Sequence, residues 1–300
     1  MDYILGIDLG GTNIKAVLTN PQGQLIDETT TPTEDHGGAD HGMSWKQKVK
    51  EIVDRFRNEK SGGIKVVGMA APGLANPHND AIAYMPNKLI GLEEFVWKDF
   101  LEIDTYILND AHAALVAESR MGAGKGYSDI VLLTLGTGIG GGIMIGGQLM
   151  QGQRNRAGHI GHISVNQNID QSVVGMPGSV ENAIGECTIK ARTYGRFQST
   201  KELVLAYQAG DTFASWVWLE SVQQLARGVA SIINSLSPEL IILGGGIMQA
   251  GDVLTRPLSD FLEIYEWRPG GFTTRIVPAM LKGQAGAVGA AIFAHQKVTQ

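Results

Sequence analysis

The sequence predicts a globular α/β protein built from two lobes. The chain has 300 residues, of which 43% are hydrophobic and 18% charged, a size and balance typical of a folded protein with more than one core. Short apolar runs with strand character alternate with segments of helical periodicity. A pattern of apolar strand, glycine-rich turn and apolar strand occurs twice, which predicts a duplicated architecture with a ligand between its two copies.

The first third of the chain opens as a β-meander, in which extended segments are separated by turn residues. A helix is expected next, because apolar side chains recur at helical spacing from Trp45 to Phe56. A buried type of strand follows that helix. The strands of this region are expected at residues 3–7, 14–18, 24–30 and 64–69.

Beyond residue 100, a brief strand at 106–108 runs into Asn109 and Asp110. An alanine-rich helix is expected at 111–121, with Gly122 just past its end. The longest helical pattern covers 213–236. Further strands are expected at 130–135, 142–145 and 240–243.

The boundary between the lobes is expected near residue 107, although no low-complexity linker marks it. The small lobe then comprises residues 1–107 and is completed by a C-terminal helix over 285–300, a small apolar segment. The large lobe comprises residues 108–284. These bounds follow from the duplicated pattern rather than from a change in composition.

Charge and cysteine content exclude several classes of protein. The net charge is −6 and no long basic run is present, which argues against nucleic acid as the main partner. The single cysteine, Cys187, excludes an internal disulfide and a multi-cysteine metal site. No apolar stretch approaches the roughly 18 residues of a membrane span, and the acidic residues near the start are unlike a secretion signal. A cytoplasmic protein is expected.

The glycine content points to turns that approach a ligand. Glycine accounts for 40 of the 300 residues, about 13% against a usual value of about 7%. The turns Gly10-Gly11-Thr12 and Gly136-Thr137-Gly138 expose backbone N–H groups that can bind an anion. Either turn alone is more typical of a tight hairpin, but the duplication favours one polyphosphate held from both sides.

A dinucleotide-binding site is the main alternative at the second turn. Gly136, Gly138 and Gly141 match its glycine spacing and follow a strand. That fingerprint must also open a helix and have an acidic residue about 20 positions later. Here the next segment has strand character and no acidic residue lies between Leu135 and Asn168, so this alternative is disfavoured. The Walker phosphate-binding pattern is absent as well.

Five motifs follow one another along the chain: Asp8-Leu-Gly-Gly-Thr-Asn13, Asn109-Asp110-Ala-His-Ala-Ala, Leu135-Gly-Thr-Gly-Ile-Gly-Gly-Gly, Ala157-Gly-His-Ile-Gly-His162 and Leu243-Gly-Gly-Gly246. Taken in this order, they resemble the motifs of the ROK family of sugar kinases, in the actin–hexokinase–Hsp70 ATPase superfamily. The resemblance covers nearly the whole chain and implies a two-lobed actin-like ATPase fold, also described as ribonuclease H-like, with a duplicated β-sheet core and a ligand cleft between lobes. ROK repressors carry an additional N-terminal helix-turn-helix, whereas Asp8 comes almost at once here, which favours a kinase.

The resemblance implies ATP and Mg²⁺ as cofactors. Asp8 would help to hold the hydrated Mg²⁺, and the glycine turns would bind the phosphates. The segment Gly244, Gly245 and Gly246 would lie near the adenosine. The remaining residues implied to bind the nucleotide are Gly10, Gly11, Thr12, Asn13, Gly136, Thr137 and Gly138.

The catalytic base of the family falls on Asp110. Phosphoryl transfer to a sugar needs a carboxylate that accepts the hydroxyl proton and orients the oxygen. Without the other motifs, Asp110 would be read as a helix N-cap; the motif set favours the catalytic role. The neighbouring Asn109 is expected to contact the sugar.

Further sugar contacts are implied at His159, His162 and Glu181. Members resembling glucokinases have a glutamate where this chain has His159, whereas some N-acetylmannosamine kinases have a similar histidine. A neutral imidazole offers one donor and one acceptor, so His159 raises the case for an N-acyl sugar. Gly73 and Asn87, in Ala71-Pro-Gly73 and Met85-Pro-Asn87, resemble the family's small-lobe sugar contacts.

The chain departs from the family at its structural zinc site. Most members bind zinc through the His162 equivalent and three cysteines, whose positions here hold Ser172, Val174 and Ser179. Hydroxyl and alkyl groups cannot replace thiolates on zinc. No zinc is therefore expected, and packing and hydrogen bonds should hold this loop.

These expectations combine into an ATP-dependent kinase that phosphorylates the 6-hydroxyl of a glucose-type hexose. A kinase for N-acetylmannosamine or another N-acyl-hexosamine is the alternative within the same fold. A non-catalytic sugar sensor is the alternative from another class, although the intact Asp8 and Asp110 disfavour it. Family members are often dimers, so a homodimer with a small-molecule sugar as ligand is expected.

Overall fold

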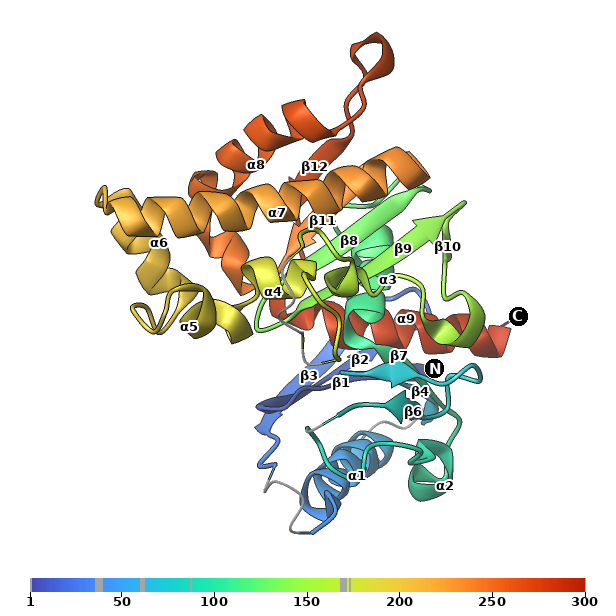
Figure 1. Ribbon diagram of the computed structural model, residues 1–300. Coiled ribbons are helices and arrows are strands. Elements are labelled where there is room, and N and C mark those ends of the chain that lie inside the picture. Colours follow the sequence, from blue (N-terminus) through green and yellow to red (C-terminus); the bar gives the residue numbers. More distant parts are fainter. Residues whose placement is uncertain are drawn as a thin grey trace. The chain divides into compact units, whose positions relative to one another are not determined.

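The computed structural model describes residues 2–35, 40–59, 63–86, 88–167, 172 and 174–299. The chain forms two compact units (Figure 1). The first consists of Met1–Gly126, Leu149–Ala157 and Met280–Gln300, and the second of Tyr127–Gln148 and Gly158–Ala279. Each unit is built around its own five-stranded sheet.

The sheet of the first unit has the strand order β3-β2-β1-β4-β7. The first three strands are an antiparallel meander, and β4 and β7 continue the sheet in parallel with β1. A two-stranded sheet of β5 (Leu74–Ala75) and β6 (Ile82–Tyr84) follows β4. The main strands are β1 (Tyr3–Leu9), β2 (Asn13–Thr19), β3 (Leu25–Pro32), β4 (Ile64–Ala71) and β7 (Thr105–Asn109).

Helices cover the first sheet. The apolar side chains of α1 (Met43–Glu59), from Trp45 to Phe56, are buried in one core with β1, β2 and β4, as their helical spacing predicts. Smaller helical elements complete this unit: α2 (Trp97–Leu101), η1 (Gln153–Asn155) and η6 (Lys282–Gln284).

The C-terminal helix α9 (Ala285–Thr299) packs very closely on the sheet and on α3 (Asp110–Met121). A Cβ atom at Gly6 or Gly68 would collide with the backbone of α9 at Ala287 or Ala290, and one at Gly289 would collide with Ala113. These three glycines therefore serve packing, so the high glycine content reflects helix–sheet contact as well as candidate ligand turns.

The sheet of the second unit repeats the first strand by strand, in the order β10-β9-β8-β11-β12. β8 and β9 are antiparallel, whereas β8, β11 and β12 are parallel. This repetition confirms the predicted duplicated β-sheet core. The strands are β8 (Ile130–Leu135), β9 (Ile139–Ile145), β10 (Gln148–Leu149), β11 (Leu240–Gly244) and β12 (Arg275–Pro278).

The long helix α7 (Thr212–Leu236) carries the core of the second unit, where Trp218, Val222 and Leu225 are fully buried. It packs with α6 (Thr200–Gln208) and α8 (Asp252–Tyr265), two helices that the sequence analysis does not predict. Short elements connect these parts: η2 (Ile160–His162), α4 (Val180–Ile184), η3 (Glu186–Thr188), α5 (Ile189–Arg192), η4 (Gly246–Ala250) and η5 (Pro269–Gly271).

The compact units divide the chain differently from the lobes expected around residue 107. Packing places α3 with the first unit, together with 149–157, although the sequence analysis puts these residues in the large lobe. The lobe boundary stays a prediction, because a functional lobe need not coincide with a packing unit. Across the described residues, no helix combines the length and the apolar character that crossing a bilayer would require.

Candidate functional site

The first glycine turn, Gly10–Asn13, connects β1 and β2 in the first unit. The N–H of Gly10 donates to the carbonyl oxygen of Asn13 (3.0 Å), and the hydroxyl of Thr33 donates to the carbonyl oxygen of Gly10 (2.6 Å). Gly11 and Thr12 are exposed. A Cβ at Gly11 would meet no protein atom within 4 Å, so the space over this turn is open to a ligand.

Asp8 is the last residue but one of β1, two positions before Gly10. Among the described residues, no hydrogen bond or ion pair reaches its partly buried carboxylate. Burial raises the pKa of Asp8 to about 6, the negative charge of Asp110 adds to the rise, and Lys15 opposes it. A carboxylate that lacks protein donors and lies near a second carboxylate suits a hard divalent cation such as Mg²⁺, which prefers oxygen ligands and keeps several waters.

Asp110 is positioned by the start of α3. The side chain of Asn109 caps the helix by accepting from the N–H of Ala111 (2.9 Å), and the same N–H donates to Oδ1 of Asp110 (2.8 Å). Desolvation raises the pKa of the Asp110 carboxyl, whereas the Ala111 hydrogen bond lowers it. A carboxylate with a raised pKa is a stronger proton acceptor.

Asn109 also connects α3 to the loop after β4. Its Nδ2 donates to the carbonyl oxygen of Gly73 (2.9 Å). Gly73 has a φ of +100°, and a Cβ there would lie 2.6 Å from the carbonyl oxygen of Tyr84. The structure thus brings Gly73, Asn109 and Asp110 together, while Asn87 lies outside the described residues.

The second glycine turn, Gly136–Gly138, connects β8 and β9 in the second unit. The next segment is a strand and not a helix, the feature for which a dinucleotide fingerprint is disfavoured here. The N–H groups of Glu186 and Cys187 donate to the carbonyl oxygens of Gly136 (3.0 Å) and Thr137 (2.9 Å). A Cβ at Gly136 would approach only the carbonyl oxygen of Gly138, at 3.8 Å, so this turn is also open.

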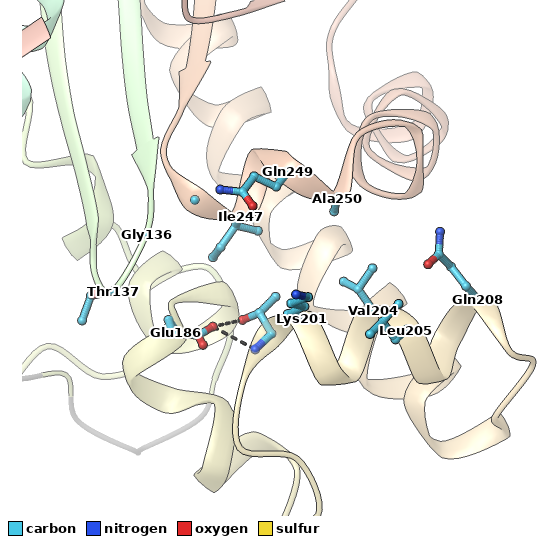
Figure 2. A pocket seen from close by; sticks show the side chains of 12 residues that line it. Gly136, Thr137, Glu186, Lys201, Val204, Leu205, Gln208, Ile247, Gln249 and Ala250 are labelled. Carbon is cyan, nitrogen blue, oxygen red and sulfur yellow. Dashed lines mark hydrogen bonds between the residues drawn. The ribbon is translucent and has the colours of Figure 1, made fainter. Parts of the chain in front are cut away.

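A cavity of about 580 Å³ adjoins the second turn (Figure 2). Three residues predicted to bind the nucleotide, Gly136, Thr137 and Gly246, line it. Gly244 and Gly245 directly precede Gly246 in the chain, and a Cβ at Gly245 would collide with the backbone of Leu135. The lining residues that the sequence analysis did not single out are Glu186, Thr200, Lys201, Val204, Leu205, Gln208, Ile247, Gln249 and Ala250.

His159, His162 and Glu181 form a polar group in the second unit. His159 directly precedes η2 and His162 is its last residue, and their imidazole rings have nearly parallel planes with a centroid distance of 6.2 Å. The N–H of Val180 donates to the carbonyl oxygen of Ile163 (2.9 Å), which joins the segments that carry His162 and Glu181. Among the described residues, the buried His162 Nδ1 and Glu181 Oε1 have no hydrogen-bond partner.

Glu181 also contacts the second glycine turn. Its Oε2 accepts from the N–H of Ile139 (3.1 Å) and would lie 2.5 Å from a Cβ at Gly138. Buried polar atoms without partners are rare in proteins. Oε1 of Glu181 and Nδ1 of His162 each keep the capacity for one more hydrogen bond, separate from the Ile139 contact.

Hydrogen bonds hold the loop in which two serines are expected to correspond to cysteines of the family. The Ser172 hydroxyl oxygen accepts from the N–H of Met176 (3.2 Å), and that of Ser179 accepts from the N–H of Asn182 (3.1 Å), which caps α4. Both serines are buried. Over the part of the chain that is described, no three His, Cys, Asp or Glu side chains are grouped as a metal site would require.

The chain resembles known sugar kinases over nearly its full length. A glucokinase of Halalkalibacterium halodurans is 30% identical, with 98% of this chain and 96% of that protein covered. An N-acetylmannosamine kinase of Escherichia coli is 28% identical, with 97% and 98% covered.

Solved structures give the same result. A ROK hexokinase from Thermus thermophilus superposes with a TM-score of 0.87 at 28% identity, with 99% of each chain covered. A ROK family glucokinase from Streptomyces griseus, determined with glucose and AMPPNP, has a TM-score of 0.78 at 27% identity, with 98% of this chain and 99% of that chain covered. The ROK family itself is matched over residues 4–297, and the chain therefore belongs to the ROK family.

Proposed function

We propose that the protein transfers the γ-phosphoryl group of ATP to the 6-hydroxyl of a glucose-type hexose. The observation that carries this proposal is the placement of Asp110 at the first position of α3, where Asn109 caps the helix and binds the Gly73 loop. A rigidly held carboxylate with a raised pKa is the group that this reaction requires. The glucokinase relatives support the choice of sugar.

In this mechanism Asp110 accepts the proton of the sugar hydroxyl and orients its oxygen for attack. The backbone amides of the open turns at Gly11 and Gly136 bind phosphate oxygens. The phosphates can come close to these amides because glycine has no side chain in the way. Asp8 would hold Mg²⁺ through water, and the ion, when bound, would supply charge neutralisation at the phosphates. His162 and Glu181 bind sugar hydroxyls through their unpartnered atoms.

A kinase for N-acetylmannosamine or another N-acyl-hexosamine is the second candidate. His159 favours it, because an imidazole replaces the carboxylate that would accept two hydroxyl hydrogen bonds. The N-acetylmannosamine kinase relative supports this candidate as well.

A sugar sensor is disfavoured by the retained Asp8 and Asp110. A cytoplasmic location and a homodimer complete the proposal, and sedimentation of the purified protein tests the dimer.

The decisive experiment measures ADP release from Mg·ATP with glucose, mannose, fructose, N-acetylglucosamine and N-acetylmannosamine. The sugar of this panel with the highest kcat/KM identifies the substrate class. It also shows whether His159 favours a plain hexose or an N-acyl-hexosamine. Asp110→Asn serves as the catalytic control. ADP release that is independent of every sugar, from a folded protein that binds no sugar in calorimetry, would refute the kinase proposal.

A further inference from the structure

The cavity of Figure 2 contains an acidic side chain, Glu186, whose position is fixed at two points. Its backbone N–H donates to the carbonyl oxygen of Gly136 (3.0 Å). Its Oε2 accepts from the N–H of Thr200 (2.9 Å) and from the Thr200 hydroxyl. Glu186 therefore joins the second glycine turn to the first turn of α6.

Arg192 holds the segment that carries Glu186. Its Nη2 donates to the carbonyl oxygen of Gly185 (3.1 Å), and its Nε donates to the hydroxyl oxygen of Thr188 (3.0 Å). Burial lowers the pKa of Arg192 to about 10, while Cys187 and Glu186 oppose this shift. The guanidinium thus remains a cation at neutral pH and contacts the backbone just before Glu186 and the Thr188 side chain after it.

The lining of the cavity follows the order of parts in a nucleotide. The glycine turn lies at one end, and Glu186 comes next, with Thr200 hydrogen-bonded to it. Helix α6 then presents Lys201, followed by Val204 and Leu205 as an apolar wall (Figure 2). The proposed function, on which this inference rests, assigns the phosphates to the turn. If the base packs on the apolar wall, the sugar of the nucleotide lies beside Glu186.

We infer that Glu186 selects the phosphoryl donor by accepting hydrogen bonds from the ribose hydroxyls. Ribose offers two neighbouring O–H donors, and a carboxylate is an acceptor with capacity beyond its two Thr200 contacts. A deoxyribose removes one donor. Inorganic polyphosphate offers none and brings negative charge toward the carboxylate, so Glu186 disfavours it.

Calorimetric binding of Mg·ATP, Mg·2′-deoxyATP, Mg·3′-deoxyATP and a linear polyphosphate tests the inference. We expect the wild-type protein to bind ATP at least about tenfold more tightly than one of the deoxy analogues, the effect of a charge-assisted hydrogen bond. Glu186→Gln should reduce this ratio to about threefold or less and admit polyphosphate as a competitor. Its amide oxygen can still accept from Thr200, so the fold should be retained.

The control is Glu220→Gln, which removes the same charge from an exposed position on α7 outside this cavity and should leave every ratio unchanged. Equal binding of ATP and both deoxy analogues by the wild type would overturn the inference without any variant, as would an unchanged ratio in folded Glu186→Gln. Sugar-dependent ADP release, measured on the same preparations, separates the two proposals. Normal turnover without ribose preference refutes the role of Glu186 alone, whereas absent turnover with all sugars refutes the proposed function.

Discussion

Asp8 carries a carboxylate that the described protein groups do not neutralise, and this has a cost in stability. Its pKa rises from 3.8 to about 6 on folding, so the unfolded chain loses the proton at a lower pH than the folded chain. The penalty is absent below about pH 4, grows between pH 4 and 6, and is complete above pH 6. Asp8→Asn should therefore raise the free energy of unfolding at pH 7.5 by up to about 3 kcal/mol.

Denaturant unfolding of both proteins at pH 4 and pH 7.5, without divalent cations, checks this. The gain should be present at pH 7.5 and small at pH 4, while Asp8→Asn loses sugar phosphorylation. Glu51→Gln, which removes an exposed acid on α1, should change stability little at either pH. A gain of equal size at both pH values would show that the charge of Asp8 is not its cause.

Asp110 is the first residue of α3 and the proposed proton acceptor, and its structural and chemical contributions can be tested separately. Asp110→Asn should lower kcat about 10²–10⁴-fold, the usual contribution of a general base. The helix should remain intact because Asn109, not Asp110, is its N-cap. Calorimetry should show sugar affinity within a few fold of wild type. Near-normal kcat in Asp110→Asn would remove it as the base.

Glycines serve two different purposes in this protein: some allow close packing against α9, and others leave a turn open to a ligand. One pair of variants can distinguish these two roles. Gly68→Ala places a methyl group on the backbone of α9 at Ala290 and should cost about 1–3 kcal/mol or more, as overpacking does. Gly11→Ala meets no protein atom and should leave stability within about 0.5 kcal/mol, the range of surface substitutions.

Thermal unfolding and Mg·ATP titration of the two variants provide the measurement. Gly11→Ala should weaken Mg·ATP binding despite normal unfolding, because the methyl group occupies the space left for a phosphate. Unaltered nucleotide affinity in Gly11→Ala would mean that this turn is only a hairpin.

The elements that could be predicted from the sequence are those with a strong local pattern. The duplicated strand–glycine–strand units became two sheets of matching order, and helices α3, α7 and α9 have bounds close to those expected. Helix α6 is short, and Pro257 interrupts the pattern of α8. Local patterns therefore do not predict either helix. They also do not predict the wall of the cavity, which α6 provides.

The candidate site residues likewise fall into those that belong to a local sequence motif and those that do not. Asp8, Gly11, Asp110 and Glu181 belong to ordered motifs, so their sequence context singled them out. Glu186 lies in no motif, and its significance arises only because it contacts Thr200, fourteen positions later. An amphipathic pattern recognised at 200–208 would have been the one available signal. The packing of α3 with α9 depends on contacts far apart in the sequence, which local patterns cannot encode.

The chain as a whole is expected to fold without any metal, although the proposed phosphoryl transfer would use Mg²⁺. Each unit has its own extensive apolar core, and the loop with Ser172 and Ser179 is closed by hydrogen bonds rather than by thiolate ligands. EDTA should therefore abolish phosphoryl transfer while leaving the thermal unfolding midpoint of the ligand-free protein unchanged. Restoring Mg²⁺ alone should recover activity, because Asp8 needs only a hard, hydrated cation.

Elemental analysis of the purified protein should find no stoichiometric zinc. One zinc per chain, lost to the chelator together with several degrees of stability, would place a metal in this loop and show that the correspondence of Ser172, Val174 and Ser179 to the family's cysteines is wrong.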